Sequence, residues 1–215
     1  MSDNNPRLVV IEGPDGTGKS TQVEAVVRAL ASAGVTAEAF HHEAPSRRED
    51  VRTRWQRALA FAAQRAALDA RLGVINCDVV VCDRWWHSTH VEAVRRCDSA
   101  LGSLAHAENR ALPTPAIVVV LDAPDRVLNE RLKARGESVT SFDRDCRAIY
   151  REAVGDAKLW TRTLPMEPVP APLVVIDTSG EPVETTRRIA TEIMDALGLP
   201  LVGWDADGRE VARVG

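Results

Sequence analysis

Residues 13–20 read Gly13-Pro14-Asp15-Gly16-Thr17-Gly18-Lys19-Ser20 and match the phosphate-loop pattern G-x-x-x-x-G-K-[ST] in full. An apolar run at residues 8–11 precedes this loop, and an amphipathic helical pattern follows it. Glycines let backbone N–H groups turn toward phosphate oxygens, a lysine neutralises the outer phosphates, and a hydroxyl can ligate Mg²⁺. A plain glycine-rich turn would not require Lys19 and Ser20, so the sequence predicts an ATP-type triphosphate site. Its candidate nucleotide-binding residues are Gly13, Asp15, Gly16, Thr17, Gly18, Lys19, Ser20 and Thr21.

Short apolar runs alternate with helical patterns along the chain, and this alternation predicts the fold class. The expected strands are residues 8–11, 35–40, 79–82, 117–121 and 173–176. The run at 117–121 shows no apolar/polar alternation, which is typical of a parallel strand that is covered on both faces. We therefore expect a doubly wound α/β fold with helices on both faces of a five-stranded, mainly parallel sheet.

Length and composition limit the classes of protein to consider. The chain has 215 residues, 45% of them hydrophobic, and a formal charge of −4. We expect one domain over residues 1–198 and a tail or small hairpin over residues 199–215. The negative charge argues against binding to a nucleic-acid polymer. The four cysteines lack zinc spacing, and neither a membrane span nor a signal peptide is seen, so we expect a cytoplasmic protein with reduced thiols and no membrane partner.

A second candidate site follows the apolar strand at 79–82, where an acid and an arginine stand together. Ligands of open α/β sheets lie beyond the carboxyl ends of the strands, so Asp83 and Arg84 should reach the edge that carries the phosphate loop. There Asp83, with Ser20, can hold Mg²⁺ or its bound water, and Arg84 can grip a phosphate with two N–H groups. Alone, such a pair more often forms a salt bridge or a helix cap. The phosphate loop favours the catalytic interpretation.

A third signal lies on a long helix expected over about residues 51–72. The residues expected on its core side are Trp55, Leu59, Ala62, Ala63 and Ala66. Phe61 and Arg65 lie one turn apart along a different line of the helix. An aromatic ring beside a guanidinium suits a nucleobase, which needs a stacking surface and donors for its carbonyl oxygens. Spacing alone leaves open a core Phe61 and a solvated Arg65.

Several blocks of sequence together resemble the thymidylate kinase family of P-loop nucleoside monophosphate kinases. The blocks are residues 11–22, 61–65, 83–85 with 88–89, 112–115 and 118–122. Their order and approximate spacing match the family over about residues 7–198. The resemblance implies a three-layer kinase domain with a short lid at about residues 131–142. It also implies transfer of the ATP γ-phosphate, with Mg²⁺, to a deoxynucleoside monophosphate such as dTMP, and a homodimer.

The resemblance also implies roles for individual residues. Phe61 corresponds to the aromatic residue that stacks on the base, and Arg65 to the arginine that reads the base. Arg84 corresponds to the arginine that holds the acceptor phosphate. The expected substrate-binding residues are Asp15, Phe61, Arg65, Arg84, Ser88 and Glu92. The expected catalytic residues are Lys19, Asp83, Arg84, Arg131 and Arg135, and the expected metal ligands are Ser20 and Asp83.

This chain departs from the family pattern at three places. The family's R-E-P-G-G segment, whose arginine helps to hold the acceptor phosphate, is replaced by residues 41–48, in which Arg47 or Arg48 could substitute. Glu92 stands where the family usually places an aromatic residue against the sugar 2′ position. We therefore expect a weaker barrier to ribose. The lid is trimmed and keeps the basic residues Arg131, Lys133 and Arg135.

The motifs leave three classes of function to compare: a kinase for deoxynucleotides, a family relative with another acceptor, and a nucleotide-binding switch or regulator without catalysis. A kinase for dTMP or a related deoxynucleotide agrees with most motifs. A family relative that acts on a modified or purine nucleotide, or on a nucleoside, is the main alternative because of Glu92 and the missing R-E-P-G-G segment. A non-catalytic regulator is disfavoured because Lys19, Ser20 and Arg84 are present, and a GTPase is disfavoured because the chain has no N-K-x-D motif.

Overall fold

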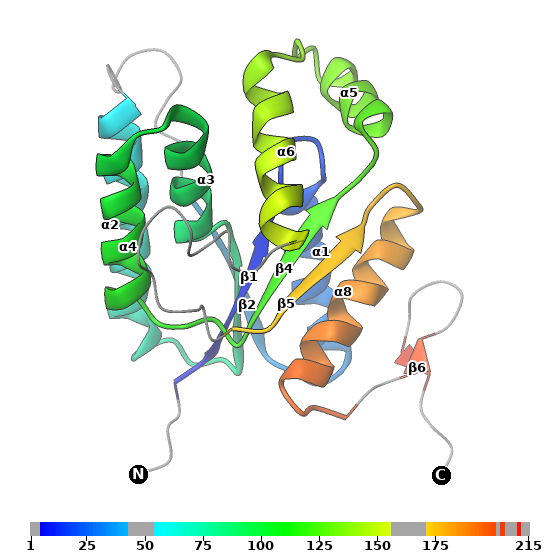
Figure 1. The fold of residues 1–215 in the computed structure, drawn as a ribbon. Helices are drawn as coiled ribbons and strands as arrows, with labels where there is room; N and C mark the ends of the chain where they lie inside the picture. Colours follow the sequence, from blue (N-terminus) through cyan, green and yellow to red (C-terminus); the bar gives the residue numbers. More distant parts are fainter. Residues whose placement is uncertain (1–4, 43–53, 156–170, 201–202, 205–209, 212–215) are drawn as a thin grey trace.

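Five parallel strands form the central sheet of the computed structural model, which describes residues 5–42, 54–155, 171–200, 203–204 and 210–211 (Figure 1). The strands are β1 (Arg7–Glu12), β2 (Ala37–His41), β3 (Val79–Asp83), β4 (Ile117–Asp122) and β5 (Leu173–Asp177). They are hydrogen-bonded in the order β2-β3-β1-β4-β5, and every pairing within this sheet is parallel. The predicted α/β fold is thereby confirmed.

Helices cover both faces of the sheet and make three layers (Figure 1). One face carries α1 (Lys19–Ser32) and α8 (Pro182–Ala196), and the other carries α2 (Arg54–Leu72), α3 (Trp86–Arg96), α4 (Ser99–Ala111) and α6 (Ser141–Gly155). Strand β4 shows why its sequence lacks alternation. Val119 packs on the side of α1 and α8, while Val118 and Val120 pack on the opposite side. Both faces of the strand are buried, as the sequence predicted.

The buried side of α2 differs from the prediction. Leu59, Ala63 and Ala66 are exposed, Leu59 to 52% of its surface, although they were expected in the core. The helix buries Arg65 and Leu68 instead. The physical reason is that an arginine can enter the interior when a carboxylate pairs with it, and such a partner is invisible within the helix's own pattern.

The structure describes the segment predicted to form the lid and part of the segment predicted to form the tail. Helix α5 (Asp125–Ala134) lies beyond the carboxyl ends of the strands, and residues 135–140 join it to α6 (Figure 1). Near the carboxyl terminus, β6 (Gly203–Trp204) and β7 (Glu210–Val211) pair as antiparallel strands. The sequence left open a tail or a small hairpin over residues 199–215, and most of that segment lies outside the described residues.

The phosphate loop is fitted tightly against the sheet at its first glycine. Gly13 has a φ of +137°, and a Cβ atom placed on it would lie 2.3 Å from the carbonyl oxygen of Leu121 at the end of β4. Backbone atoms cannot move away as a flexible side chain can. The close contact between the loop and β4 therefore requires glycine at this position.

We expect Gly13→Ala to lower the free energy of unfolding by about 2–4 kcal/mol, because it combines a forbidden φ with a backbone clash. Gly73→Ala is the matched control, since a Cβ there meets nothing within 4 Å and φ lies outside the left-handed region. It should change stability by less than about 0.5 kcal/mol. Urea denaturation of both variants measures the difference, and equal midpoints would contradict the tight fit at Gly13.

Candidate active site

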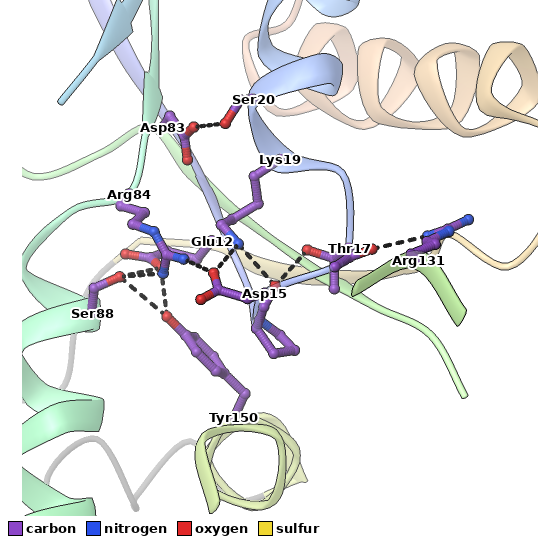
Figure 2. A network of polar contacts seen from close by, with 12 residues as sticks. Glu12, Asp15, Thr17, Lys19, Ser20, Asp83, Arg84, Ser88, Arg131 and Tyr150 are labelled. Carbon is purple, nitrogen blue, oxygen red and sulfur yellow. Dashed lines mark hydrogen bonds and ion pairs between the residues drawn. The ribbon is translucent and has the colours of Figure 1, made fainter. Parts of the chain in front are cut away.

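Polar and charged side chains gather at the carboxyl edge of the sheet, around the phosphate loop (Figure 2). They come from the end of β1, from the loop itself, from the turn that joins β3 to α3, and from α6. Residues of the two predicted sites, 13–20 and 83–84, thus lie side by side. The sheet topology accounts for this arrangement, because β1 and β3 are adjacent parallel strands whose ends share one edge.

The loop curls around the start of α1. Gly13, Gly16 and Gly18 all have positive φ, and Gly18, with a φ of +89°, immediately precedes the first residue of the helix. The hydroxyl of Thr17 donates to the carbonyl oxygen of Pro14 at 2.9 Å and closes the turn. The amino end of α1 therefore opens onto the loop, and its N–H groups and dipole favour an anion there.

Lys19 lies folded over this loop. Its Nζ donates to the carbonyl oxygen of Pro14 at 2.8 Å and lies 3.6 Å from Oδ1 of Asp15. Burial of the ammonium, helped by the positive charge of Arg84, lowers the pKa of Lys19 to about 8. A phosphate bound at the loop would raise the pKa of Lys19 again, because its negative charge stabilises the buried ammonium.

Asp15 links the loop to the β3–α3 turn. Its Oδ1 accepts a short hydrogen bond from Nη2 of Arg84 and also faces Lys19 (Figure 2). Burial alone would raise the pKa of Asp15, but Arg84 and Lys19 outweigh that effect and lower it to about 2. Burial likewise opposes the charge of Arg84, and the pairing with Asp15 raises its pKa above the ordinary value. One carboxylate thus holds two cations that were predicted to bind different phosphates.

Ser20 and Asp83 form the predicted metal-binding pair. The Ser20 hydroxyl donates to Oδ2 of Asp83 at 2.6 Å, while Oδ1 of Asp83 is buried and has no hydrogen-bond partner among the described residues. A buried carboxylate oxygen needs a donor or a cation. Hydroxyl and carboxylate oxygens are also the hard ligands that Mg²⁺ takes beside substrate phosphates. These two residues therefore fit a magnesium ion.

Glu12 is the most important residue that sequence reasoning missed. Its side chain is fully buried at the end of β1, and its two oxygens accept hydrogen bonds from Trp85 N at 2.7 Å, the Ser88 hydroxyl at 2.9 Å and the Tyr150 hydroxyl at 2.8 Å. Burial and the charge of Glu12 raise the pKa of Tyr150 well above its ordinary value. The sequence feature that could have identified Glu12 is an acidic residue at the end of an otherwise apolar strand.

Arg65 is engaged by a buried ion pair. Its Nε and Nη2 donate to the two carboxylate oxygens of Glu108 on α4, at 2.6 and 2.9 Å. Nη2 also donates to the Thr89 hydroxyl on α3 at 2.9 Å. Arg65 is only 1% exposed, so the alternative of a solvated arginine is wrong. Sequence reasoning missed Glu108 because it belongs to a different helix.

Phe61 and Glu92 have defined neighbours. The ring of Phe61 is half-buried and meets the ring of His42 edge-on, with centroids 5.7 Å apart. Glu92 forms ion pairs with Arg95, at 3.0 Å, and with Arg96 on the same helix. Burial would raise the pKa of Glu92, but these two arginines outweigh it and lower the pKa. Glu92 therefore stays charged.

The two predicted lid arginines differ in position. Arg131 donates to the Thr178 hydroxyl at 3.1 Å and to the carbonyl oxygen of Gly16 at 3.4 Å, so it touches the phosphate loop directly. Arg135 is exposed and faces Glu137 at 3.8 Å. Thr21 is exposed on α1. Arg47 and Arg48, the suggested substitutes for the missing family arginine, lie outside the described residues.

Comparison with known proteins agrees with the geometry. A family model described as thymidylate kinase matches residues 11–167. A putative thymidylate kinase of Treponema pallidum is 34% identical over 66% of this chain and 76% of that protein. A thymidylate kinase of Caulobacter vibrioides is 28% identical over 89% of this chain and 98% of that protein.

A solved structure shows the same fold. The thymidylate kinase of Candida albicans is 16% identical, has a TM-score of 0.62, and is matched over 90% of this chain and 93% of that one. Within the described part of the chain, we find no helix that is both long and apolar enough to cross a membrane.

We expect the contribution of Asp15 to stability to depend on pH. Its pKa falls from 3.8 to about 2 on folding, so the carboxylate stabilises the fold above pH 4 and loses this effect as the pH drops toward about 2. The effect should be small because 46% of the side chain is exposed to screening solvent.

Denaturation midpoints of the wild type and Asp15→Asn, measured between pH 2 and pH 6, test this expectation. The midpoint of the wild type should exceed that of the variant above pH about 4, and the two should converge at the acid end. A gap that widens as the pH falls would contradict the ion pair with Arg84.

Proposed function

Because this chain belongs to the thymidylate kinase family, we propose that it transfers the γ-phosphate of ATP to dTMP and so forms dTDP and ADP. The observation that carries this proposal is the contact of Asp15 with both Lys19 and Arg84. One of these cations belongs to the loop for the donor phosphates, and the other to the turn proposed to hold the acceptor phosphate. Their shared partner supports a site where two phosphates meet.

In the donor half, the loop N–H groups and Lys19 bind the triphosphate. Ser20 and Asp83 would hold Mg²⁺, which when bound neutralises charge on the outer phosphates. Arg131 contacts Gly16 and lies where it can add positive charge beside the loop. Arg135 can approach as the short lid moves over the nucleotide.

In the acceptor half, Arg84 binds the phosphate of dTMP and Ser88 orients Arg84, since the Ser88 hydroxyl accepts from Nη1 at 3.1 Å. Phe61 stacks on the base. Arg65 donates to the O4 carbonyl through Nη1, because Glu108 and Thr89 take Nε and Nη2. Asp15 and Glu92 face the sugar.

Phosphoryl transfer requires positioning and charge neutralisation more than covalent chemistry. The acceptor phosphate is already ionised at neutral pH, so no general base is needed. The chain's contribution is to bring two anionic groups together and to offset their repulsion. Lys19 and Arg84 do this around one carboxylate oxygen of Asp15, and their charges act strongly because Lys19 is buried and Arg84 is only 30% exposed.

We also propose a homodimer in the cytoplasm. The exposed small and apolar side of α2, with Leu59, Ala63 and Ala66, supports a helix-to-helix interface with a second copy. Four free thiols support a reducing compartment: Cys77, Cys82, Cys97 and Cys146.

We expect Lys19→Ala to remove most turnover and Arg84→Ala to impair use of the acceptor selectively. Charge-assisted hydrogen bonds contribute about 1.5–3 kcal/mol each, so Arg84→Ala should lower kcat/KM for dTMP more than about tenfold. The KM for ATP should change less than about threefold. A coupled ADP-release assay with each substrate varied in turn measures both constants.

Arg187→Ala is the matched control, because Arg187 forms an exposed ion pair with Glu184 on α8 and has no proposed role in the site. It should leave both constants unchanged. Weakened ATP use with unchanged dTMP use in Arg84→Ala would move Arg84 to the donor side. Full activity in excess EDTA would contradict the magnesium requirement.

We expect a preference for bases with an oxygen at position 4. Arg65 offers a donor, and cytosine presents an amine at that position, so dTMP and dUMP should be used far better than dCMP. The charged Glu92 leaves the sugar side polar and without an aromatic barrier. UMP should therefore be used measurably, and Glu92→Tyr should raise the ratio of dUMP to UMP use.

The decisive measurement is the initial rate with dTMP, dUMP, dCMP, dGMP and UMP at equal concentration. Glu108→Gln supplies a further variant, because loss of the carboxylate releases Arg65 and should narrow the gap between dTMP and dCMP. Rates for dCMP or dGMP far above that for dTMP would contradict the role of Arg65. Complete exclusion of UMP would contradict the role of Glu92.

A further inference from the structure

His42 lies directly after β2, between the proposed base and phosphate subsites. Its ring meets Phe40 edge-on at a centroid distance of 5.2 Å and Phe61 edge-on at 5.7 Å. Its Nε2 lies 3.0 Å from the carbonyl oxygen of Arg84. One side chain therefore touches both the proposed stacking aromatic and the backbone of the proposed phosphate-binding arginine.

The backbone at Arg84 adopts a conformation that needs support. Its φ is +73°, in the left-handed region that non-glycine residues seldom occupy. Such conformations persist only where surrounding contacts hold them. Four hydrogen bonds surround this residue. Arg84 N donates to the Ile11 carbonyl at 3.0 Å, and Trp85 N donates to Glu12. The Arg84 carbonyl accepts from His42 and from the Cys82 thiol.

The hydrogen bond fixes the state of the imidazole. A carbonyl oxygen accepts, so Nε2 of His42 must carry the proton. Nδ1 is buried and has no hydrogen-bond partner among the described residues. A second proton there would be a buried donor without an acceptor, close to the positive Arg65. Burial and Arg65 accordingly lower the pKa of His42, and the ring stays neutral with a single donor.

We propose that His42 is a positioning residue for the acceptor phosphate: its Nε2–H bond to the Arg84 carbonyl holds the left-handed turn that aims the Arg84 guanidinium, while Phe40 and Phe61 fix the ring. The inference rests on the proposed function, because it assigns Arg84 to the acceptor. It gives His42 neither a proton-transfer nor a metal-binding role. The His42 ring also couples base stacking to phosphate binding, because it contacts both Phe61 and the Arg84 carbonyl. A shift of Phe61 would therefore move the backbone at Arg84.

The test compares dTMP with thymidine, which presents the same base and sugar without the phosphate. His42→Leu keeps an apolar side chain against Phe61 but removes the donor. His42→Gln keeps an N–H donor near the position of Nε2. In His42→Leu we expect the affinity for dTMP to fall about tenfold and that for thymidine, measured as a competitive inhibitor, to fall less than about threefold.

In His42→Gln the affinity for dTMP should return to within about threefold of the wild type. The KM for ATP should stay constant in both variants. Equal losses for dTMP and thymidine, or no rescue by glutamine, would show a purely structural role and overturn the inference. Should His42→Leu fail to fold by circular dichroism, His42→Asn takes its place, because its shorter amide cannot reach the Arg84 carbonyl.

The two proposals fail in different ways. A wild-type chain that binds dTMP no better than thymidine, or that phosphorylates none of the five nucleotides above, would contradict the proposed function itself. A wild type that is active on dTMP, combined with an unchanged His42→Leu variant, would contradict only the assignment to His42.

Discussion

The buried carboxylate of Glu12 is the constraint around which the site is arranged. It has no access to water, so each of its oxygens must find donors within the protein. The donors come from the backbone of Trp85, from Ser88 and from Tyr150, and thus from the β3–α3 turn, α3 and α6. Loss of any one donor would leave a buried carboxylate oxygen short of a hydrogen bond, at a cost of about 1–3 kcal/mol. The carboxylate therefore ties the position of the turn at Arg84 to the end of β1, and hence to the phosphate loop.

Electrostatics divides the site into two halves that share one acid. Lys19 and Arg84 repel each other, and this repulsion adds to the effect of burial in lowering the pKa of Lys19. Asp15 lies between them and offsets the repulsion, although 46% of its side chain faces solvent. A donor phosphate and an acceptor phosphate would each supply the negative charge that one exposed carboxylate only partly provides. The arrangement is therefore better suited to two bound phosphates than to none or to one, as transfer between nucleotides requires.

The sequence predicted those features that depend on short-range patterns. The sequence was sufficient to predict the loop at residues 13–20 and the buried strands β1, β3 and β4. Each of these features depends on residues within a few positions of one another. The buried face of α2 could not be predicted from its sequence. Arg65 is buried there because it pairs with Glu108, which is 43 residues away in the chain. Glu12 was missed for the same reason, since its donors Trp85 and Tyr150 are 73 and 138 residues distant. Pairing partners of buried charges are set by the tertiary fold, and apolar periodicity carries no information about them.

The two halves of the site are also formed by different parts of the chain. This difference affects which substitutions can change the choice of substrate. The proposed donor half consists mainly of backbone groups, namely the glycines of the loop and the amino end of α1. Few substitutions are tolerated there, because the glycines have positive φ and Gly13 lies against β4. The proposed acceptor half depends on side chains: Arg65 of α2 pairs with Glu108 of α4 and donates to Thr89 of α3, and Arg84 lies in the β3–α3 turn. Glu92, which pairs with Arg95 and Arg96 on its own helix, can vary there without disturbing the sheet. Departures from the family pattern are therefore expected to alter the acceptor that is used, while the phosphate loop preserves the chemistry.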